Sequence, residues 1–210
     1  MLKILIIGDS FAADWSVKYK NYKGWPELLA EQYKVTNIAQ AGVSEYKIYK
    51  QLLSINNLKE YDWVMVSHTG PYRIATKAHP IHTNDCLHSN ADLILTDIEY
   101  HASKLKNFFN RSLRSAMLFY KYHFDKDFYY ITYCLLREKI NSILKDNNVI
   151  VLSNLTNTSL ENTSLEFNEK IVLNYNILWQ QERGLVNHFT AYGNQVIYND
   201  VIKILTRNNG

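Results

Sequence analysis

The chain of 210 residues has little of what marks several special structural classes. It has only two cysteines, Cys86 and Cys134, which provide neither a disulfide framework nor a metal-finger spacing. No run of about eighteen apolar residues occurs, so we expect no membrane-spanning helix. The first residues, MLKILIIGDS, have one lysine and a short apolar run before Gly8, which does not match a signal peptide. Together these absences predict a protein of the cytoplasm.

Signatures of nucleotide and nucleic-acid binding are also missing. The net charge of +3 is spread along the chain, and no block of basic residues predicts a nucleic-acid partner. Neither the dinucleotide pattern G-x-G-x-x-G nor the phosphate-loop pattern G-x-x-x-x-G-K-[ST] occurs. We therefore expect no cofactor and no contact with nucleic acid or membrane, and the partner we expect is a small-molecule or glycan substrate. The sequence does not indicate the oligomeric state.

Apolar runs alternate with amphipathic segments along most of the chain. This alternation predicts a mostly parallel sheet covered by helices on both faces, within one α/β domain that spans 1–210. The predicted strands are 2–7, 34–39, 62–68, 147–153 and 169–175, the last of which would also fit a helical turn, and the predicted helices include 24–33, 44–55 and 190–205.

The stretch between the third and fourth predicted strands is too long for a simple crossover. Residues 71–90 have the composition of a loop, and residues 91–146 have the pattern of two or three helices. We interpret 71–146 as a helical insertion or cap beside the mouth of the site.

Three of the seven glycines follow the first three predicted strands: Gly8, Gly42 and Gly70. In a parallel sheet these strand ends share one edge, where open α/β proteins bind ligands. Ser10 lies two residues past Gly8, and His188 lies just before the last predicted helix. A serine at this edge can attack a carbonyl if a base is near, although a helix cap and a surface histidine would also explain the two residues.

Four sequence blocks in this order resemble the SGNH (GDSL-type) hydrolase family. They are GDS after the first strand, NIAQAG after the second, a glycine after the third, and NHFTAYGNQVIYNDV near the end. The match extends over most of the chain outside the insertion. It implies a flavodoxin-like three-layer α/β/α fold with a mostly parallel sheet. It also implies a serine esterase or acyltransferase that acts on an O-acyl group, such as an O-acetyl group on a glycan.

The resemblance assigns roles to individual positions. Ser10 would be the nucleophile and His188 the general base. The backbone N–H groups of Ser10 and Gly42 would form the oxyanion hole, and Asp9 would accept hydrogen bonds near the turn. A different class stays open, in which the same fold is a non-catalytic module that binds a carbohydrate or a protein partner.

The third block departs from the family pattern. The family has Gly-x-Asn-Asp after the third strand, and its Asn donates to the oxyanion. Here the residues are Gly70-Pro71-Tyr72-Arg73. Tyr72 or Arg73 would have to supply the missing donor.

The last block departs as well, because Leu185 occupies the position of the usual triad aspartate. Three explanations stay open. Glu182 replaces the aspartate, a backbone carbonyl orients His188 so that the residues work as a dyad, or catalysis has been lost.

Other polar residues follow the third strand. We expect His68, at the strand end, to contact the substrate, and we group Arg73 and Asp9 with it. The segment HPIHTNDCLH offers His79-x-x-His82 and His88, with Asp85 and Cys86 nearby. Zinc would fit such residues, but their spacing matches no standard closed site, so we interpret the segment as a polar loop without a metal.

Overall fold

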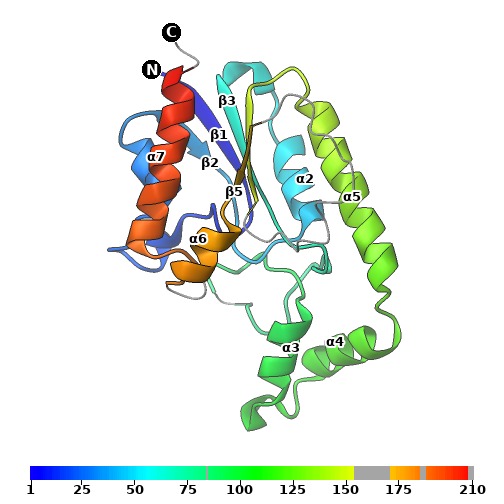
Figure 1. Cartoon of the computed structure of the whole chain (residues 1–210). Coiled ribbons are helices and arrows are strands. Elements are labelled where there is room, and N and C mark those ends of the chain that lie inside the picture. Colours follow the sequence, from blue (N-terminus) through cyan, green and yellow to red (C-terminus); the bar gives the residue numbers. More distant parts are fainter. Residues whose placement is uncertain (84, 154–170, 185–187, 208–210) are drawn as a thin grey trace.

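Five parallel strands form the centre of the molecule in the order β2-β1-β3-β4-β5. The computed structural model describes residues 1–83, 85–153, 171–184 and 188–207. Figure 1 shows the sheet between two layers of helices, with a smaller helical lobe below it. This is the three-layer α/β/α architecture that the sequence predicts. The strands are β1 (Lys3–Gly8), β2 (Lys34–Asn37), β3 (Trp63–His68), β4 (Val149–Ser153) and β5 (Ile171–Asn174).

The two central strands are buried on both faces, which explains their continuous apolar sequences. All six residues of β3 are buried, as are five of the six residues of β1. The strands pair in parallel with Gly8 opposite Ser67, so both end at the same edge. The segment 169–175, for which strand and helix both fitted, contains β5 paired with β4.

The helices divide between the two faces of the sheet. On one face, α1 and α7 cover Ile4, Ile6 and Met65 with Trp25 and other apolar side chains. On the other face, side chains of α2 and α5 pack on the remaining apolar side chains of β1 and β3. The helices are α1 (Trp25–Ala30), α2 (Glu45–Leu53), α3 (Leu95–Ala102), α4 (Arg111–Tyr122), α5 (Lys126–Ile143), α6 (Asn176–Gln181) and α7 (Ala191–Arg207).

The predicted insertion 71–146 has two structurally different parts. Ile140 of α5 and Leu144 after it are fully buried in the core between the sheet and the helices on its α2 face. Figure 1 shows α5 beside α2 on this face. This helix is therefore the crossover between β3 and β4. Residues before it form the lobe, in which α3 and α4 pack around their own small core, and the chain pairs with itself at Ile74 and Leu93.

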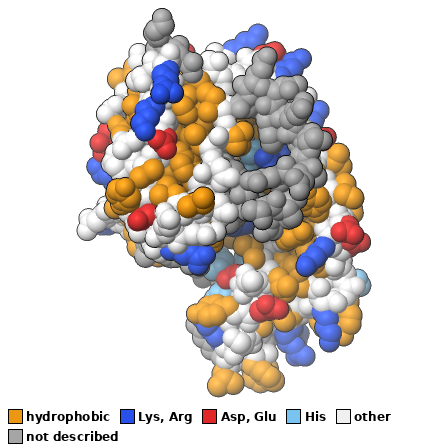
Figure 2. Space-filling model, viewed as in Figure 1, with side chains coloured by type: hydrophobic (Ala, Val, Ile, Leu, Met, Phe, Trp, Pro, Cys, Tyr) orange, Lys and Arg blue, Asp and Glu red, His pale blue; other side chains and the backbone are white. Residues whose placement is uncertain are grey.

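The outer end of the lobe is apolar. Leu105, Phe108 and Phe109 are largely exposed there, and Figure 2 shows hydrophobic side chains at this end of the molecule. None of the helices in the described part of the chain is both long and apolar enough to cross a bilayer.

Candidate active site

Gly8 ends β1 at a point where the fold leaves no room for a side chain. Its φ is +151°, and a Cβ at this position would lie 2.6 Å from both the Cβ and the carbonyl oxygen of Ser67 on β3. The side-chain amide of Gln51 on α2 binds both ends of the residue. Gly8 N–H donates to Gln51 Oε1 (2.8 Å), and Gln51 Nε2 donates to the Gly8 carbonyl (3.1 Å). These contacts fix the direction in which the chain continues into Asp9 and Ser10.

Asp9 anchors the turn from a fully buried position. Its Oδ1 accepts hydrogen bonds from the Phe11 N–H (3.1 Å) and the Ser67 hydroxyl (3.0 Å). Its Oδ2 has no hydrogen-bond partner among the described residues. Burial raises the pKa of Asp9 to about 6, although the positive charge of Arg73 acts in the opposite direction. The turn beneath Ser10 therefore contains a carboxyl group that is costly to ionise.

Ser10 and His188, from opposite ends of the chain, line one narrow pocket. Both are buried. Trp15 links them, because its indole Nε1 donates to the Ser10 carbonyl (2.7 Å) and its ring centroid lies 4.2 Å from that of His188. The Phe11 ring lies 4.8 Å from the His188 ring on another side. No hydrogen bond joins the side chains of Ser10 and His188, both of which are described residues.

A short hairpin presents His188 to this pocket. Arg183 and Phe189 form an isolated antiparallel bridge, and Gly184 N–H donates to the His188 carbonyl. A Cβ on Gly184 would lie 2.7 Å from the Phe189 carbonyl oxygen, so the hairpin needs a glycine there. Leu185, on which the question of the triad acid depends, lies outside the described residues.

Glu182, the other candidate for the third triad member, binds the start of α7. Its carboxylate accepts a hydrogen bond from the Thr190 hydroxyl (2.6 Å), and its carbonyl accepts from the Thr190 N–H (2.9 Å). Thr190 in turn caps the helix by accepting from the Gly193 N–H (3.1 Å). These bonds give Glu182 a structural role in closing the hairpin.

His68 forms a buried pair with Glu45 at the end of β3. Its Nδ1 lies 2.6 Å from Glu45 Oε1, and both side chains are almost inaccessible to solvent. A carboxylate at this distance fixes the orientation of the imidazole ring. Nothing in the sequence singles out Glu45, since a glutamate after Ser44 fits the start of a helix without any further role.

The remaining predicted oxyanion donors lie against the lobe. Gly42 has φ of +78°, and a Cβ there would lie 2.7 Å from the Cβ of Ala91. The Gly42 carbonyl accepts from the Asp92 N–H (2.9 Å). Tyr72 is partly exposed, and its ring contacts Phe124 at the end of α4. The role of its hydroxyl as an oxyanion donor stays a prediction.

Arg73 lies in the same region, and its guanidinium N–H groups are available as hydrogen-bond donors. Burial lowers the pKa of its guanidinium, while the charges of Asp9, Asp92 and Asp97 favour the charged form. Among the described residues it forms no hydrogen bond and no ion pair. Since an arginine keeps its charge even when buried, Arg73 provides a positive charge that acts on Asp9 in the turn after β1.

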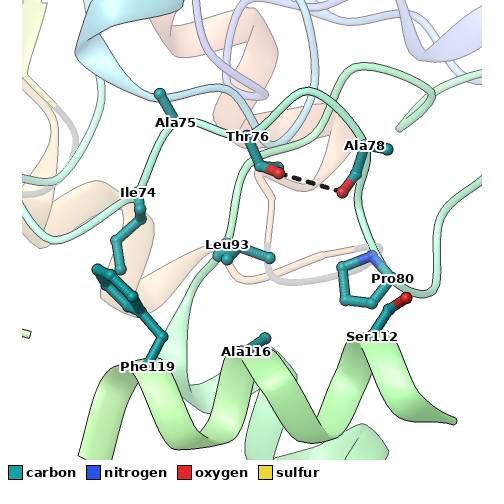
Figure 3. A pocket seen from close by; sticks show the side chains of 9 residues that line it. All are labelled: Ile74, Ala75, Thr76, Ala78, Pro80, Leu93, Ser112, Ala116 and Phe119. Atoms are coloured by element: carbon teal, nitrogen blue, oxygen red, sulfur yellow. Dashed lines mark hydrogen bonds between the residues drawn. The ribbon is translucent and has the colours of Figure 1, made fainter. Parts of the chain in front are cut away.

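A second hollow lies in the lobe and is lined largely by apolar side chains. It has a volume of about 230 Å³ and lies between α4 and the segment around residues 74–80. Figure 3 shows Ile74, Leu93 and Phe119 around it, with the Thr76 hydroxyl bonded to the Ala78 carbonyl. It shares no lining residue with the pocket of Ser10 and His188.

Solved structures with similar folds are esterases and lipases by name. An acetyl xylan esterase matches with a TM-score of 0.50 and 11% identity, over 97% of this chain and 99% of that chain. A lipase/acylhydrolase from Enterococcus faecalis matches with a TM-score of 0.49 and 11% identity, over 99% and 97% of the two chains. A protein from Desulfitobacterium hafniense, assigned to the G-D-S-L family of lipolytic proteins, has a TM-score of 0.44 and 13% identity over 95% and 97%.

The chain shares the three-layer α/β/α architecture of the acetyl xylan esterase. No family model matches the sequence. No curated protein matches it either. At such low identity the similarity concerns the fold alone, and the activity of this chain has to be argued from its own residues.

The burial of Asp9 predicts a pH dependence of stability. Its folded-state pKa of about 6 lies above the ordinary value of 3.8, so the folded protein holds this proton more tightly. The resulting stabilisation is complete below about pH 4 and is lost as the pH rises through 6. We expect Asp9→Asn to gain about 2 kcal/mol in unfolding free energy relative to the wild type between pH 4 and pH 7, as measured by urea denaturation. If the unfolding free energies of the two proteins changed with pH in parallel, this prediction would be wrong. Asp200→Asn, at a partly exposed position on α7, is the control.

The hydrogen bond from Thr190 predicts the effect of neutralising Glu182. Glutamine can still accept that bond, so we expect Glu182→Gln to retain nearly all turnover of an aryl acetate and to fold normally. Making a true triad acid neutral costs about 10⁴-fold in rate. Steady-state kinetics on the purified variant decides the question, and a loss above about a hundredfold would show that Glu182 orients His188.

Proposed function

We propose that this protein is a serine esterase that hydrolyses or transfers an O-acyl group, with Ser10 as nucleophile and His188 as base. The observation that carries the proposal is the shared pocket of these two residues at the carboxyl edge of the sheet. The constrained Gly8 turn and the ring of Trp15 hold them there. By analogy, the resemblance to the SGNH hydrolases supports this chemistry.

The reaction follows from the two side chains. His188 takes the proton of the Ser10 hydroxyl as Oγ attacks the acyl carbonyl carbon. The backbone N–H groups of Ser10 and Gly42 stabilise the oxyanion that forms. His188 then gives the proton to the departing alkoxide, and an acyl ester remains on Ser10. Water, or the hydroxyl of an acceptor, attacks this ester while His188 takes its proton, and the proton then returns to Ser10.

Arg73 is the residue we propose in place of the family's oxyanion asparagine. Its charge acts on Asp9, the neighbour of the nucleophile, and its guanidinium donors are not engaged by other described residues. A guanidinium in a site with little water stabilises a developing negative charge strongly. We further propose that a backbone carbonyl orients His188, so that Ser10 and His188 work as a dyad without a triad carboxylate.

The acyl group we propose is acetyl. Aromatic side chains close around Ser10. Phe11, Trp15 and Phe189 line its pocket, which has a volume of only about 10 Å³, so a small acyl group is the one that needs the least opening of the site. The acetyl xylan esterase with a similar fold supports an acetylated glycan as the substrate class. Aromatic rings and histidines near the site would suit a sugar through stacking and hydrogen bonds.

A non-catalytic binding module is the second candidate. The replacement of two family positions, by Tyr72 or Arg73 and by Leu185, favours it. This candidate predicts a folded protein whose ester turnover does not depend on Ser10.

Substitution of the nucleophile separates the two candidates. We expect Ser10→Ala to lower the turnover of 4-nitrophenyl acetate by at least about 10⁴-fold, because no other group replaces a lost nucleophile. Ser16→Ala changes a serine in the same segment and should keep full activity. Unchanged turnover in a folded, pure Ser10→Ala preparation would refute the esterase proposal.

The role of Arg73 has its own test. We expect Arg73→Gln to lower kcat by about 10² to 10³, the usual effect of removing one oxyanion donor, with a smaller change in KM. Arg114→Gln, on the exposed side of α4 in the same lobe, should leave both constants unchanged. A loss of less than about threefold in folded Arg73→Gln would remove Arg73 from the oxyanion site.

A further inference from the structure

Three of the chain's seven histidines surround one carboxylate in the lobe. His79 and His82 come from the loop after β3, and Asp97 and His101 lie one turn apart on α3. The Nε2 atoms of His79 and His82 lie 3.4 and 3.3 Å from Asp97 Oδ2, and that of His101 lies 3.4 Å from Oδ1. Four possible ligand groups therefore converge on a small volume between two elements.

These distances are long for hydrogen bonds to a carboxylate. Bonds between charged nitrogen donors and carboxylates have lengths of about 2.7–2.9 Å. In this protein Lys18 lies 2.7 Å from Asp85 and His68 lies 2.6 Å from Glu45, while His88 lies 3.3 Å from Asp85. All three contacts of Asp97 are longer than the first two of these by about half an ångström or more, which leaves room for an ion between the groups.

The same distances fit a tetrahedral metal. Zinc binds histidine nitrogen at about 2.0–2.1 Å and carboxylate oxygen at about 2.0–2.2 Å, so neighbouring ligand atoms are about 3.3–3.5 Å apart. The ligand atoms of His79, His82 and Asp97 all lie within 4.8 Å of one another. His79 is buried and His82 and Asp97 are partly buried, as protein ligands of a bound ion commonly are.

We propose that His79, His82 and Asp97 bind a divalent transition-metal ion, zinc fitting best, with His101 at the second oxygen of Asp97. The ion would join the loop that carries His79 and His82 to α3 and so fix the lobe. A set of nitrogen and carboxylate ligands without thiolate favours zinc over the softer copper(I) ion.

One local contact must change when the metal binds. His79 Nδ1 accepts long hydrogen bonds from the N–H groups of Ile81 (3.2 Å) and His82 (3.3 Å), which puts the ring proton on Nε2. Coordination through Nε2 moves this proton to Nδ1, so both bonds open. The amide resonances of Ile81 and His82 should therefore shift on metal addition.

This ligand set differs from the zinc pattern that HPIHTNDCLH offers. Asp85 is engaged by Lys18 (2.7 Å), and Cys86 is exposed. The two residues that complete the cluster, Asp97 and His101, come from a helix and lie fifteen or more positions beyond His79 and His82. Their i,i+4 spacing on one helix face is the signal that the sequence contained.

Zinc titration of chelator-treated, tag-free protein tests the proposal. We expect one zinc per chain by elemental analysis and calorimetry, with a higher Tm in the loaded protein. Asp97→Asn and His82→Gln should each weaken affinity by at least about a hundredfold, and His101→Gln by about 10- to 100-fold. His123→Gln, which changes an exposed histidine of the lobe, is the matched control and should bind normally.

Two results would overturn the metal site. One is the absence of stoichiometric binding to the folded wild type, and the other is unchanged binding by folded Asp97→Asn. Circular dichroism on each variant confirms folding. Ser10→Ala should bind zinc like the wild type. The metal site and the proposed esterase activity are therefore tested independently.

Discussion

The close approach of β1 and β3 at Gly8 is the constraint on which the site depends. The missing side chain lets the Gly8 backbone lie against Ser67, and Gln51 fixes the same residue from α2. A larger residue would push the strands apart or turn the chain elsewhere, because both the contact and the φ of +151° exclude a Cβ. Asp9 and Ser10 owe their positions at the carboxyl edge to this contact.

The rest of the site is assembled around that turn from distant parts of the chain. The hairpin before α7 brings His188, and Trp15 joins it to the Ser10 peptide through a hydrogen bond and a ring contact. Arg73 enters from the start of the lobe and offsets part of the cost of burying Asp9. The lobe is thus attached to the body at the place where chemistry is proposed, and a metal within it would join the loop of His79 and His82 to α3.

The sequence predicts most of the sheet because burial on both faces leaves continuous apolar runs, as in LKILII and DWVMVSH. The order of the blocks around Ser10 and His188 likewise indicates one shared edge. Pairs such as His68 with Glu45, or Asp97 with His79, could not be found in this way. They join segments that only the folded chain brings together, and each member alone fits an ordinary loop or helix. The sequence also does not separate α5 from the lobe, because the periodicity of a helix does not show which of two cores its apolar face covers.

Covalent labelling shows whether Ser10 is an activated nucleophile. The folded wild type is treated with a fluorophosphonate, and the adduct is located by intact mass and peptide mapping. We expect one adduct per chain on Ser10, formed much more slowly in His188→Gln and absent after denaturation before labelling. A folded protein that stays unlabelled, or one labelled at another residue, would contradict it.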